Sequence, residues 1–446
     1  MKKLIRIVPA ISLALAATGN AMASGFQLLE QSSSGLGTAY AGTAVLADDA
    51  TTVFTNPAGM SLLPRGKTSI AVNLNAVQPS AKFSHSTSTA ALFQTLGSGN
   101  GGDAGNLAAV PSFYVALPVG KRVSFGIGVN APFGLKTEYD SGWSGRFQGV
   151  KSDVKTLNLN PSLSYQASDA LSLGFGLNYQ KLEGEFTSAA NYAAAVFGAT
   201  GSAALAAAAG EGSARIKGDD TGWGYNFGAI YQASTATRIG FSYRSAIKYH
   251  LTGTADFSRT GNAVVNAVLG NAASSARGGA IYADIKLPDT LTLGSMTRLN
   301  DKWDMVGDLA WTGWAKIPDL TFRYADTSSI VSSTPENWRN TWRVALGGIY
   351  RHGDDWKLRF GIAYDQSPVK DDFRTVRLPD NNRTWLAVGG QYRLSKNSAL
   401  DFGYSHLFVK DGSIDGNGGN AAAYGRLMGN YSNSVDILGI QYSVAF

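Results

Sequence analysis

Large apolar residues alternate with small or polar ones in short stretches along the whole chain. In residues 171–180, LSLGFGLNYQ, the large residues Leu173, Phe175 and Leu177 are separated by glycine and other small or polar residues. A period of two is typical of a β-strand with one apolar and one polar face. We therefore expect an all-β protein, because the same alternation occurs in residues 122–130, 237–245 and 438–446.

The connections between these stretches alternate between short and long. Short turns at one end and long loops at the other are typical of an outer-membrane β-barrel. Counting strands between the connections gives about 14, an even number, as bacterial barrels require. The short connections are residues 119–121, 167–170, 233–236, 352–355 and 395–398, and the long ones lie near residues 80–107, 132–152, 184–217, 252–278, 317–338, 367–382 and 411–430.

A soluble β-sandwich is the alternative interpretation of this alternation. A sandwich exposes outer faces rich in Lys, Glu and Thr, whereas the polar face here consists largely of Gly, Ser and Asn. Glycine makes up 53 of 446 residues, roughly 12% against a usual ~7%. The composition favours the barrel, and so do aromatic residues near strand ends, where an interfacial girdle would lie: Trp311, Trp314, Trp338, Trp342 and Tyr350.

The first 23 residues are typical of a secretory signal peptide. Residues 1–23 have a basic start, an apolar middle and the ending Ala21-Met22-Ala23. Residues 192–209 are too rich in alanine for a transmembrane helix, so that a membrane-spanning fold would require a closed barrel. Without the three basic residues of the signal peptide, 35 basic residues face 32 acidic ones, which gives no reason to expect nucleic-acid binding. The chain contains no cysteine and so no disulfide.

Residues 24–66 do not alternate, although they precede the first convincing strand. They are rich in Gly, Ser and Ala, and they are neither charged nor proline-rich enough to be disordered. Small residues allow close packing in a confined lumen, and barrels of this size can be plugged. Residues 24–66 are therefore either a periplasmic tail or a hatch inside the lumen, followed by a transmembrane barrel over residues 67–446.

The hatch segment resembles the N-terminal hatch of the FadL family of outer-membrane transporters for long-chain fatty acids and related hydrophobic compounds. The resemblance rests on an ordered series of motifs: GFQL at 25–28, SSSGLGTAYAG at 32–42, ADDA at 47–50 and NPAGM at 56–60. It continues through essentially the whole mature chain. Family membership implies a 14-stranded antiparallel transmembrane barrel with an N-terminal hatch, in the Gram-negative outer membrane.

The family also implies an opening in the barrel wall. In the family, the Asn-Pro-Ala motif of the hatch, here Asn56, Pro57 and Ala58, lies beside an inward kink of the third strand, where a side window faces the membrane. An ordinary turn is the alternative interpretation of Asn-Pro. Because proline donates no ladder hydrogen bond and glycine tolerates a bend, a break is plausible at the matching residues: Asn130, Ala131, Pro132, Phe133 and Gly134.

Two long loops contain apolar residues at helical spacing, which is unusual for loops exposed to water. We expect these residues to pack on each other as a cap and also to form an external groove that captures a hydrophobic ligand, as the loops do in the family. Phe26 and Leu28, near the mature N-terminus, match residues of the family's deeper pocket, although simple packing of the plug also explains them. The loop residues are Tyr192, Val196 and Phe197, and Val264, Val265, Val268 and Leu269.

A fatty acid would need a cation for its carboxylate. The best-known fatty-acid transporters of the family have basic residues at positions that match Ser188 and Thr334, and this chain has neither. Arg339 and Arg343 are nearby alternatives. Neutral hydrophobic compounds, such as the aromatic hydrocarbons that other family members carry, therefore remain possible ligands, and a general porin is the alternative from another class.

We expect neither an enzymatic role nor a cofactor. The four histidines are scattered without metal-ligand spacing, and no G-x-S-x-G motif occurs. The expected partners are a hydrophobic small molecule, outer-membrane lipid and lipopolysaccharide, and the barrel-assembly machinery through the C-terminal Phe446. We expect the barrel to be a monomer.

Overall fold

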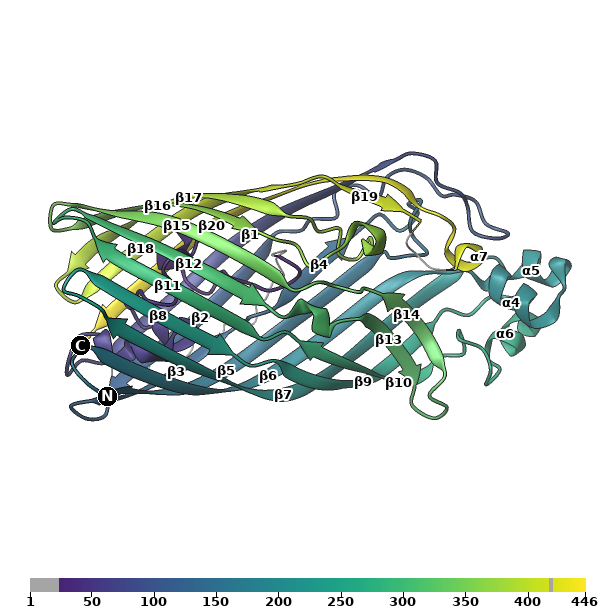
Figure 1. Cartoon of the computed structure of the whole chain (residues 1–446). Coiled ribbons are helices and arrows are strands. Elements are labelled where there is room, and N and C mark those ends of the chain that lie inside the picture. The colour runs from purple at the N-terminus through teal and green to yellow at the C-terminus, as the bar shows by residue number, and fades with distance from the viewer. Residues whose placement is uncertain (1–23, 417–419) are drawn as a thin grey trace.

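The chain forms one closed antiparallel β-barrel with a folded segment inside it (Figure 1). The structure is a computed structural model and describes residues 24–416 and 420–446. The expected signal peptide, residues 1–23, lies outside the described residues. None of the helices in the described part of the chain is long and apolar enough to cross a membrane.

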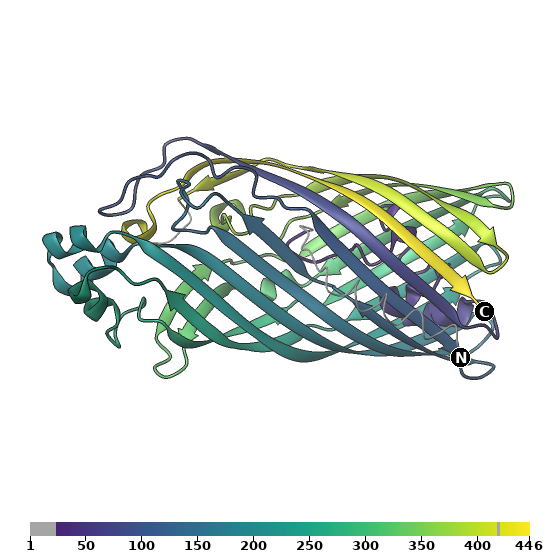
Figure 2. The same ribbon diagram turned by 180° about the vertical axis from the view of Figure 1, so that it is seen from behind.

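The barrel has 14 strands, as predicted, and several of them are interrupted, so that two segments in line make one barrel strand. Figure 2 shows the first strand beside the last, which closes the wall; their pairing runs from Ser69 opposite Ala445 to His85 opposite Gly429. In order, the barrel strands are β1 (Ser69–His85), β2 (Ala108–Pro118), β3 (Val123–Asn130) with β4 (Gly134–Glu138), β5 (Lys151–Gln166), β6 (Leu171–Ala190), β7 (Gly212–Gln232), β8 (Thr237–Arg244) with β9 (Ile247–Phe257), β10 (Gly279–Leu287) with β11 (Thr290–Arg298), β12 (Trp303–Thr312) with β13 (Asp319–Tyr324), β14 (Ile330–Pro335) with β15 (Thr341–His352), β16 (Trp356–Asp365), β17 (Arg383–Ser395), β18 (Ser398–Val409) with β19 (Gly412–Asp415), and β20 (Met428–Ala445).

The alternation places the apolar face outside and the small face inside. On β6, Phe175 and Leu177 are 48% and 44% exposed, whereas Gly176 and Asn178 point inward and are buried. A barrel in lipid needs this arrangement, because the outward face meets acyl chains. One predicted loop is wrong: residues 317–338 contain the hairpin of β13 and β14, which continues the wall beyond an interruption at η2 (Trp314–Lys316).

The end with the long loops carries short helices. Figure 1 shows α4, α5 and α6 clustered beyond the last strand pairs. The helices are α4 (Tyr192–Thr200), α5 (Ala203–Ala209), α6 (Ala263–Leu269) and α7 (Ala421–Tyr424), with η3 (Asp371–Phe373) in the loop after β16.

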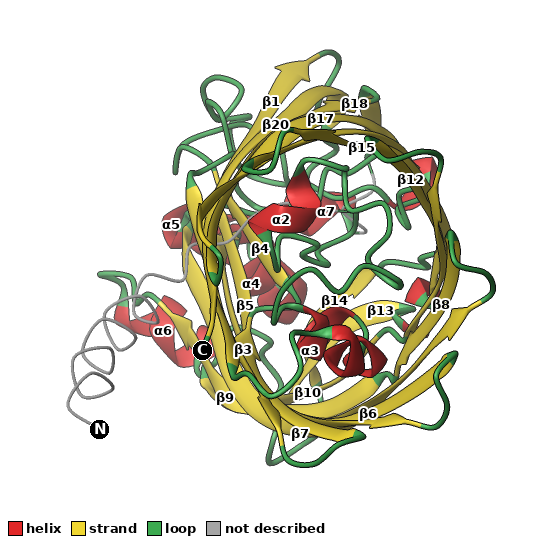
Figure 3. Ribbon diagram, turned by 90° about the vertical axis from the view of Figure 1, so that its left-hand side faces the viewer, coloured by secondary structure: helices red, strands yellow, loops and turns green. Residues whose placement is uncertain are grey.

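Residues 24–68 precede β1, and most of this segment is folded inside the ring of strands (Figure 3). The segment contains α2 (Ser33–Leu36), α3 (Thr52–Thr55) and η1 (Pro57–Leu62). Its charged and polar groups bind the wall: Asp48 forms ion pairs of 3.3 Å with Lys357 and with Arg359. Asp49 accepts a hydrogen bond of 2.8 Å from Gln441. These carboxylates therefore anchor the hatch to the wall.

Inward glycines of the wall leave room for the hatch backbone. A Cβ on Gly361 would stand 2.0 Å from the backbone carbon of Thr38, and a Cβ on Gly174 would stand 2.2 Å from the backbone nitrogen of Ala58. Because backbone atoms of a packed segment cannot yield by more than an ångström, larger residues at these positions are incompatible with the hatch. The glycine-rich inner face thus fits this particular plug.

We predict that Gly361→Val will displace the hatch while the barrel still closes. The valine side chain would collide with the Thr38 backbone, and the vacated lumen would conduct ions. Single-channel recording in planar bilayers should show a larger and steadier current than in the native protein.

Gly348→Val is the matched control, because its Cβ would face outward, 3.4 Å from the Trp303 ring. Migration on a gel before heating checks that both barrels are folded. A native-like current from a folded Gly361→Val barrel would contradict the prediction.

Candidate functional site

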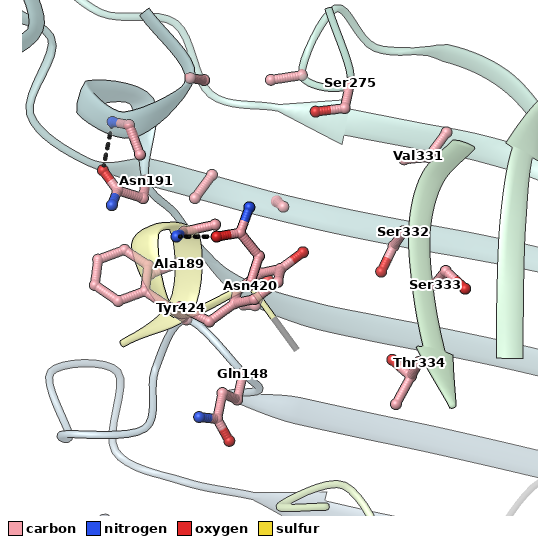
Figure 4. A pocket seen from close by; sticks show the side chains of 18 of the residues that line it. Gln148, Ala189, Asn191, Ser275, Val331, Ser332, Ser333, Thr334, Asn420 and Tyr424 are labelled. Atoms are coloured by element: carbon pink, nitrogen blue, oxygen red, sulfur yellow. Dashed lines mark hydrogen bonds between the residues drawn. The ribbon is translucent and has the colours of Figure 1, made fainter. Parts of the chain in front are cut away.

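A cavity of about 490 Å³ opens at the end of the barrel that carries the long loops. It falls within the usual size range of small-molecule sites, about 300–1,000 Å³. Figure 4 shows Tyr424 of α7 and the N-cap residue Asn420 on one side of it and residues 331–334 of β14 on the other. Further parts of the lining come from β6, α4, β7 and residues 375–377.

The apolar lining of this cavity exists because the strands reverse their alternation partway along. On β6, the odd-numbered residues from Leu171 to Tyr179 are apolar and face outward, but the next three, Lys181, Glu183 and Glu185, are charged. Leu182 and Phe186 point inward there and are buried. Beyond the apolar belt, the barrel therefore has apolar residues inside and charges outside, as a water-soluble protein has. This change of phase at residue 180 is visible in the sequence, although the strand prediction did not include it.

Arg377 is the only charged residue among the described residues that line the cavity. Its Nη1 donates hydrogen bonds of 3.2 Å to the Lys151 carbonyl and to Ser152 Oγ, and its guanidinium lies 5.5 Å from the Phe186 ring centre. Burial lowers the pKa of Arg377 to about 10, so the group stays charged at neutral pH. Its Nε and Nη2 form no hydrogen bond within the described chain. The edge of the guanidinium group that carries these two nitrogens is therefore available to a carboxylate.

Glu336 is the carboxyl group whose charge would raise the pKa of Arg377, and this carboxyl group is largely neutral. It is buried, and Trp338 Nε1 donates a hydrogen bond of 2.9 Å to its Oε2. Burial raises the pKa of Glu336 to about 8, although the positive charge of Arg377 opposes this shift. At neutral pH most of this carboxyl is protonated, and the charge of Arg377 therefore remains available to a ligand.

The predicted loop residues divide into two groups. Tyr192 and Phe197 line the cavity. Three others, Val196, Val265 and Leu269, are buried together where α4 packs against α6. Val268 packs against that cluster, and Val264 is 59% exposed. The helices thus form a cap by packing on each other, and α4 contributes one face to the cavity.

A second, smaller cavity of about 110 Å³ lies between the hatch and the wall. Leu28, Phe133 and Arg343 are among its lining residues. Arg343 donates a hydrogen bond to the Ala39 carbonyl of the hatch, and its buried Nε has no partner. Arg339 lines neither cavity: it is exposed and donates to the Ser367 carbonyl at 3.0 Å.

Phe26 belongs to a cluster of four aromatic rings that joins the hatch to the wall. Its ring centre lies 5.7 Å from Phe133, 5.2 Å from Trp314 and 5.8 Å from Trp338. Nearby, the Gly25 amide donates to the Asp380 carboxylate at 2.9 Å. Ring pairs at such distances add to the stability that burial provides. The cluster holds the first residues of the hatch against the break in the third strand.

The third barrel strand breaks at Ala131, Pro132 and Phe133, between β3 and β4. Pairing of β2 with β3 stops at Phe113 opposite Val129, so that residues 108–112 pair with β1 alone. The hatch takes the missing place: the Leu28 amide donates to the Pro132 carbonyl at 2.8 Å, and the Gly134 amide to the Phe26 carbonyl at 2.9 Å. Here the hatch acts as a short substitute strand.

The Asn-Pro-Ala motif binds a different part of the wall. Asn56 Nδ2 donates to the carbonyls of Ala229 on β7 and Phe241 on β8, at 3.3 and 3.1 Å. Asn56 Oδ1 accepts from the Ala58 amide at 3.1 Å, and Pro57 begins η1. Residues 26–28 and Gln31 of the hatch form the hydrogen bonds to the kink, with Gln31 Nε2 donating to the Ala131 carbonyl at 2.8 Å. Asn130 instead joins the network of inward asparagines through Asn158 at 3.1 Å.

Sequence reasoning missed Arg377, Trp314 and Trp338 as part of these sites. Arg377 lies in the loop after β16, and a single arginine in a polar loop carries no signal that the loop folds into the lumen. The tryptophans were interpreted as an interfacial girdle, but both are buried inside the barrel. No group of three or more potential metal ligands occurs among the described residues.

We predict that Phe26→Ala will release the start of the hatch from the kink. Replacing a buried phenylalanine by alanine costs about 3–5 kcal/mol, which exceeds what two backbone hydrogen bonds contribute, about 0.5–1.5 kcal/mol each. Hydrogen–deuterium exchange should accelerate in residues 26–31 and 131–134, and stay slow in residues 51–62.

Phe360→Ala serves as the control, since Phe360 is 45% exposed on the outer face. Unchanged exchange at the kink in Phe26→Ala would show that the aromatic cluster does not hold the hatch there.

Comparisons with known proteins agree with this architecture. The family model described as "Outer membrane protein transport protein (OMPP1/FadL/TodX)" matches residues 14–446. The chain is 30% identical over 439 residues to the long-chain fatty acid transport protein of Escherichia coli O6:H1, with 93% of each chain covered. It is 33% identical over 430 residues to outer membrane protein P1 of Haemophilus influenzae, covering 91% of this chain and 90% of that one. The crystal structure of a Pseudomonas aeruginosa FadL homologue matches with a TM-score of 0.84 at 26% identity, covering 94% of this chain and 99% of that one. The chain belongs to the FadL family of outer-membrane transport proteins.

Proposed function

We propose that the chain takes up long-chain fatty acids, or hydrophobic acids like them, passively across the outer membrane. The observation that carries this proposal is the cavity at the end with the long loops, where apolar side chains such as Phe186 and Ile216 stand beside Arg377, the single cation among the described lining residues. An apolar lining suits an acyl chain, and the free edge of a guanidinium suits a carboxylate. The names of the fatty-acid transport relatives agree with this choice.

The route we propose has three steps. The ligand is captured beside Tyr192 and Phe197, moves to the inner cavity at Leu28 and Arg343, and leaves sideways where the third strand is broken. Arg343 suits the inner step because its buried Nε lacks a partner. A lateral exit keeps the acyl chain out of water, which would otherwise cost roughly 25 cal/mol for each Å² of apolar surface exposed.

Two other functions make different demands on the site. A transporter of neutral compounds, such as aromatic hydrocarbons, has no need for an unpaired cation in its cavity. A general porin needs an open lumen, whereas residues 24–68 here are packed against inward glycines of the wall. We also propose that the protein is not an enzyme, since the acidic pair Asp48 and Asp49 serves to anchor the hatch.

Arg377→Gln should weaken the binding of a long-chain fatty acid by about tenfold to a hundredfold. A hydrogen bond to a charged group contributes about 1.5–3 kcal/mol, and glutamine keeps much of the side chain's bulk. The fatty alcohol of the same chain length should bind equally well to both proteins, because it carries no charge. Calorimetry on the barrel in detergent measures both ligands.

Arg339→Gln is the matched control, since Arg339 lies outside both cavities. Uptake of the labelled acid by cells that depend on this barrel should fall in the Arg377 variant at low ligand concentration. Equal losses for acid and alcohol would contradict recognition of a carboxylate, and would favour a carrier of neutral compounds.

A further inference from the structure

Two lysines face each other on the outer surface of the barrel without a carboxylate partner. Lys248 on β9 and Lys286 on β10 are directly opposite in the antiparallel register. Lys248 is exposed and Lys286 half-buried, and both alternate with inward residues. Neither forms an ion pair or a hydrogen bond through its ammonium group within the described chain. Like charges directly opposite on a sheet destabilise it, so an anion that binds both ammonium groups would relieve their repulsion.

The carboxylates nearby are bound to other groups. Asp284, one outward position beyond Lys286, lies 2.7 Å from His250 Nδ1. Asp220 accepts a hydrogen bond of 2.7 Å from the His250 amide. Asp289, just past the end of β10, lies 2.5 Å from Lys316 Nζ. The two ammonium groups therefore remain free to bind an anion that comes from outside the protein.

The lysines lie at the boundary between the apolar belt and the charged surface. Below them the outward residues are apolar, as Tyr243 on β8 and Leu293 on β11 illustrate, and above them come His250 and Asp284. On β7, Trp223 is 67% exposed, and a Cβ on its neighbour Gly222 would stand 2.8 Å from the Lys248 carbonyl. Exposed tryptophan marks the level of lipid headgroups.

This boundary is the one nearer the long loops, because β9 and β10 extend toward α4 and α6 (Figure 1). In an outer-membrane barrel that end faces the cell exterior. The outer leaflet there consists of lipopolysaccharide, and the phosphates of its lipid A lie at the headgroup level. A lysine ammonium binds phosphate as a point charge, and directly opposite residues have Cβ atoms about 4.5–5.5 Å apart, so one phosphate can reach both.

We propose that Lys248 and Lys286 form a binding site for a phosphate of outer-leaflet lipopolysaccharide, with the acyl chains of that lipid against the apolar belt below. The site depends on the outer-membrane location and not on the identity of the transported ligand. Phosphate binding at this site fixes the height of the barrel in the membrane. The site is separate from the two transport cavities, since neither lysine lines either cavity.

The test compares the native barrel with the double variant Lys248→Gln/Lys286→Gln in detergent, with divalent cations chelated. The probes are fully phosphorylated lipid A and dephosphorylated lipid A, and native mass spectrometry measures their binding. A cation near an anionic lipid surface contributes about 1 kcal/mol, so the variant should bind phosphorylated lipid A about thirtyfold more weakly. Binding of the dephosphorylated lipid should not change.

Lys302→Gln/Lys396→Gln is the matched control, because both of these lysines are exposed in short turns at the other end and form no ion pair within the described chain. Lys248→Arg/Lys286→Arg should restore binding, and it also covers the case in which the glutamine variant folds poorly. Equal affinity of native and glutamine-substituted barrels for phosphorylated lipid A would overturn the proposal. Displacement of the lipid by millimolar inorganic phosphate would also overturn it, because the site would then bind any phosphate.

Discussion

The backbone hydrogen bonds between the hatch and the broken third strand are the constraint on which the rest of the structure depends. A wall in lipid must satisfy every backbone amide and carbonyl, because acyl chains offer no partners. Where β2 and β4 do not pair, the Leu28 amide and the Phe26 carbonyl bind the kink at Pro132 and Gly134. The hatch thus belongs to the wall as well as to the lumen. Any opening there requires that these groups find other partners, such as water or a ligand.

The remainder of the hatch provides the rigidity that this closure needs. Inward glycines such as Gly174 and Gly361 let its backbone approach the strands, while Asn56 binds β7 and β8 and Asp48 binds β16. The first residues are held differently, by the rings around Phe26. An apolar ligand that enters this aromatic cluster can compete with Phe26 for its contacts, whereas it has nothing to offer the polar anchors. The hatch is therefore held in two ways, its body by polar groups and close backbone contacts and its start by aromatic rings.

Alternation along the sequence was enough to predict the strands and their lipid-facing side, because one face of each strand meets a uniform solvent, whereas the hatch was predicted from the motifs of residues 24–66 that resemble the family. The same reasoning failed where that solvent changes. Residues 317–338 were expected to be a loop, but Phe322 and Tyr324 point inward from a wall that stands in water, which reverses the pattern. Arg377, the candidate residue for binding a ligand's carboxylate, was missed for another reason. Its position depends on how a long polar loop folds into the lumen. The substitute strand at the kink was equally hidden, since backbone hydrogen bonds leave little trace in side-chain chemistry.

A reversible crosslink between the hatch and the kink tests the central claim most directly. Gln27 and Phe133 lie directly opposite each other, between the two hydrogen bonds. In such a non-hydrogen-bonded antiparallel pair the Cα atoms are about 4.5 Å apart, which is within the range of disulfides. The chain contains no cysteine to interfere. In the variant Gln27→Cys/Phe133→Cys, the oxidised barrel should bind fatty acid but not transport it, and a reductant should restore uptake relative to the single variants. Equal uptake by the oxidised and reduced forms would show that the ligand leaves without displacing the hatch from the kink.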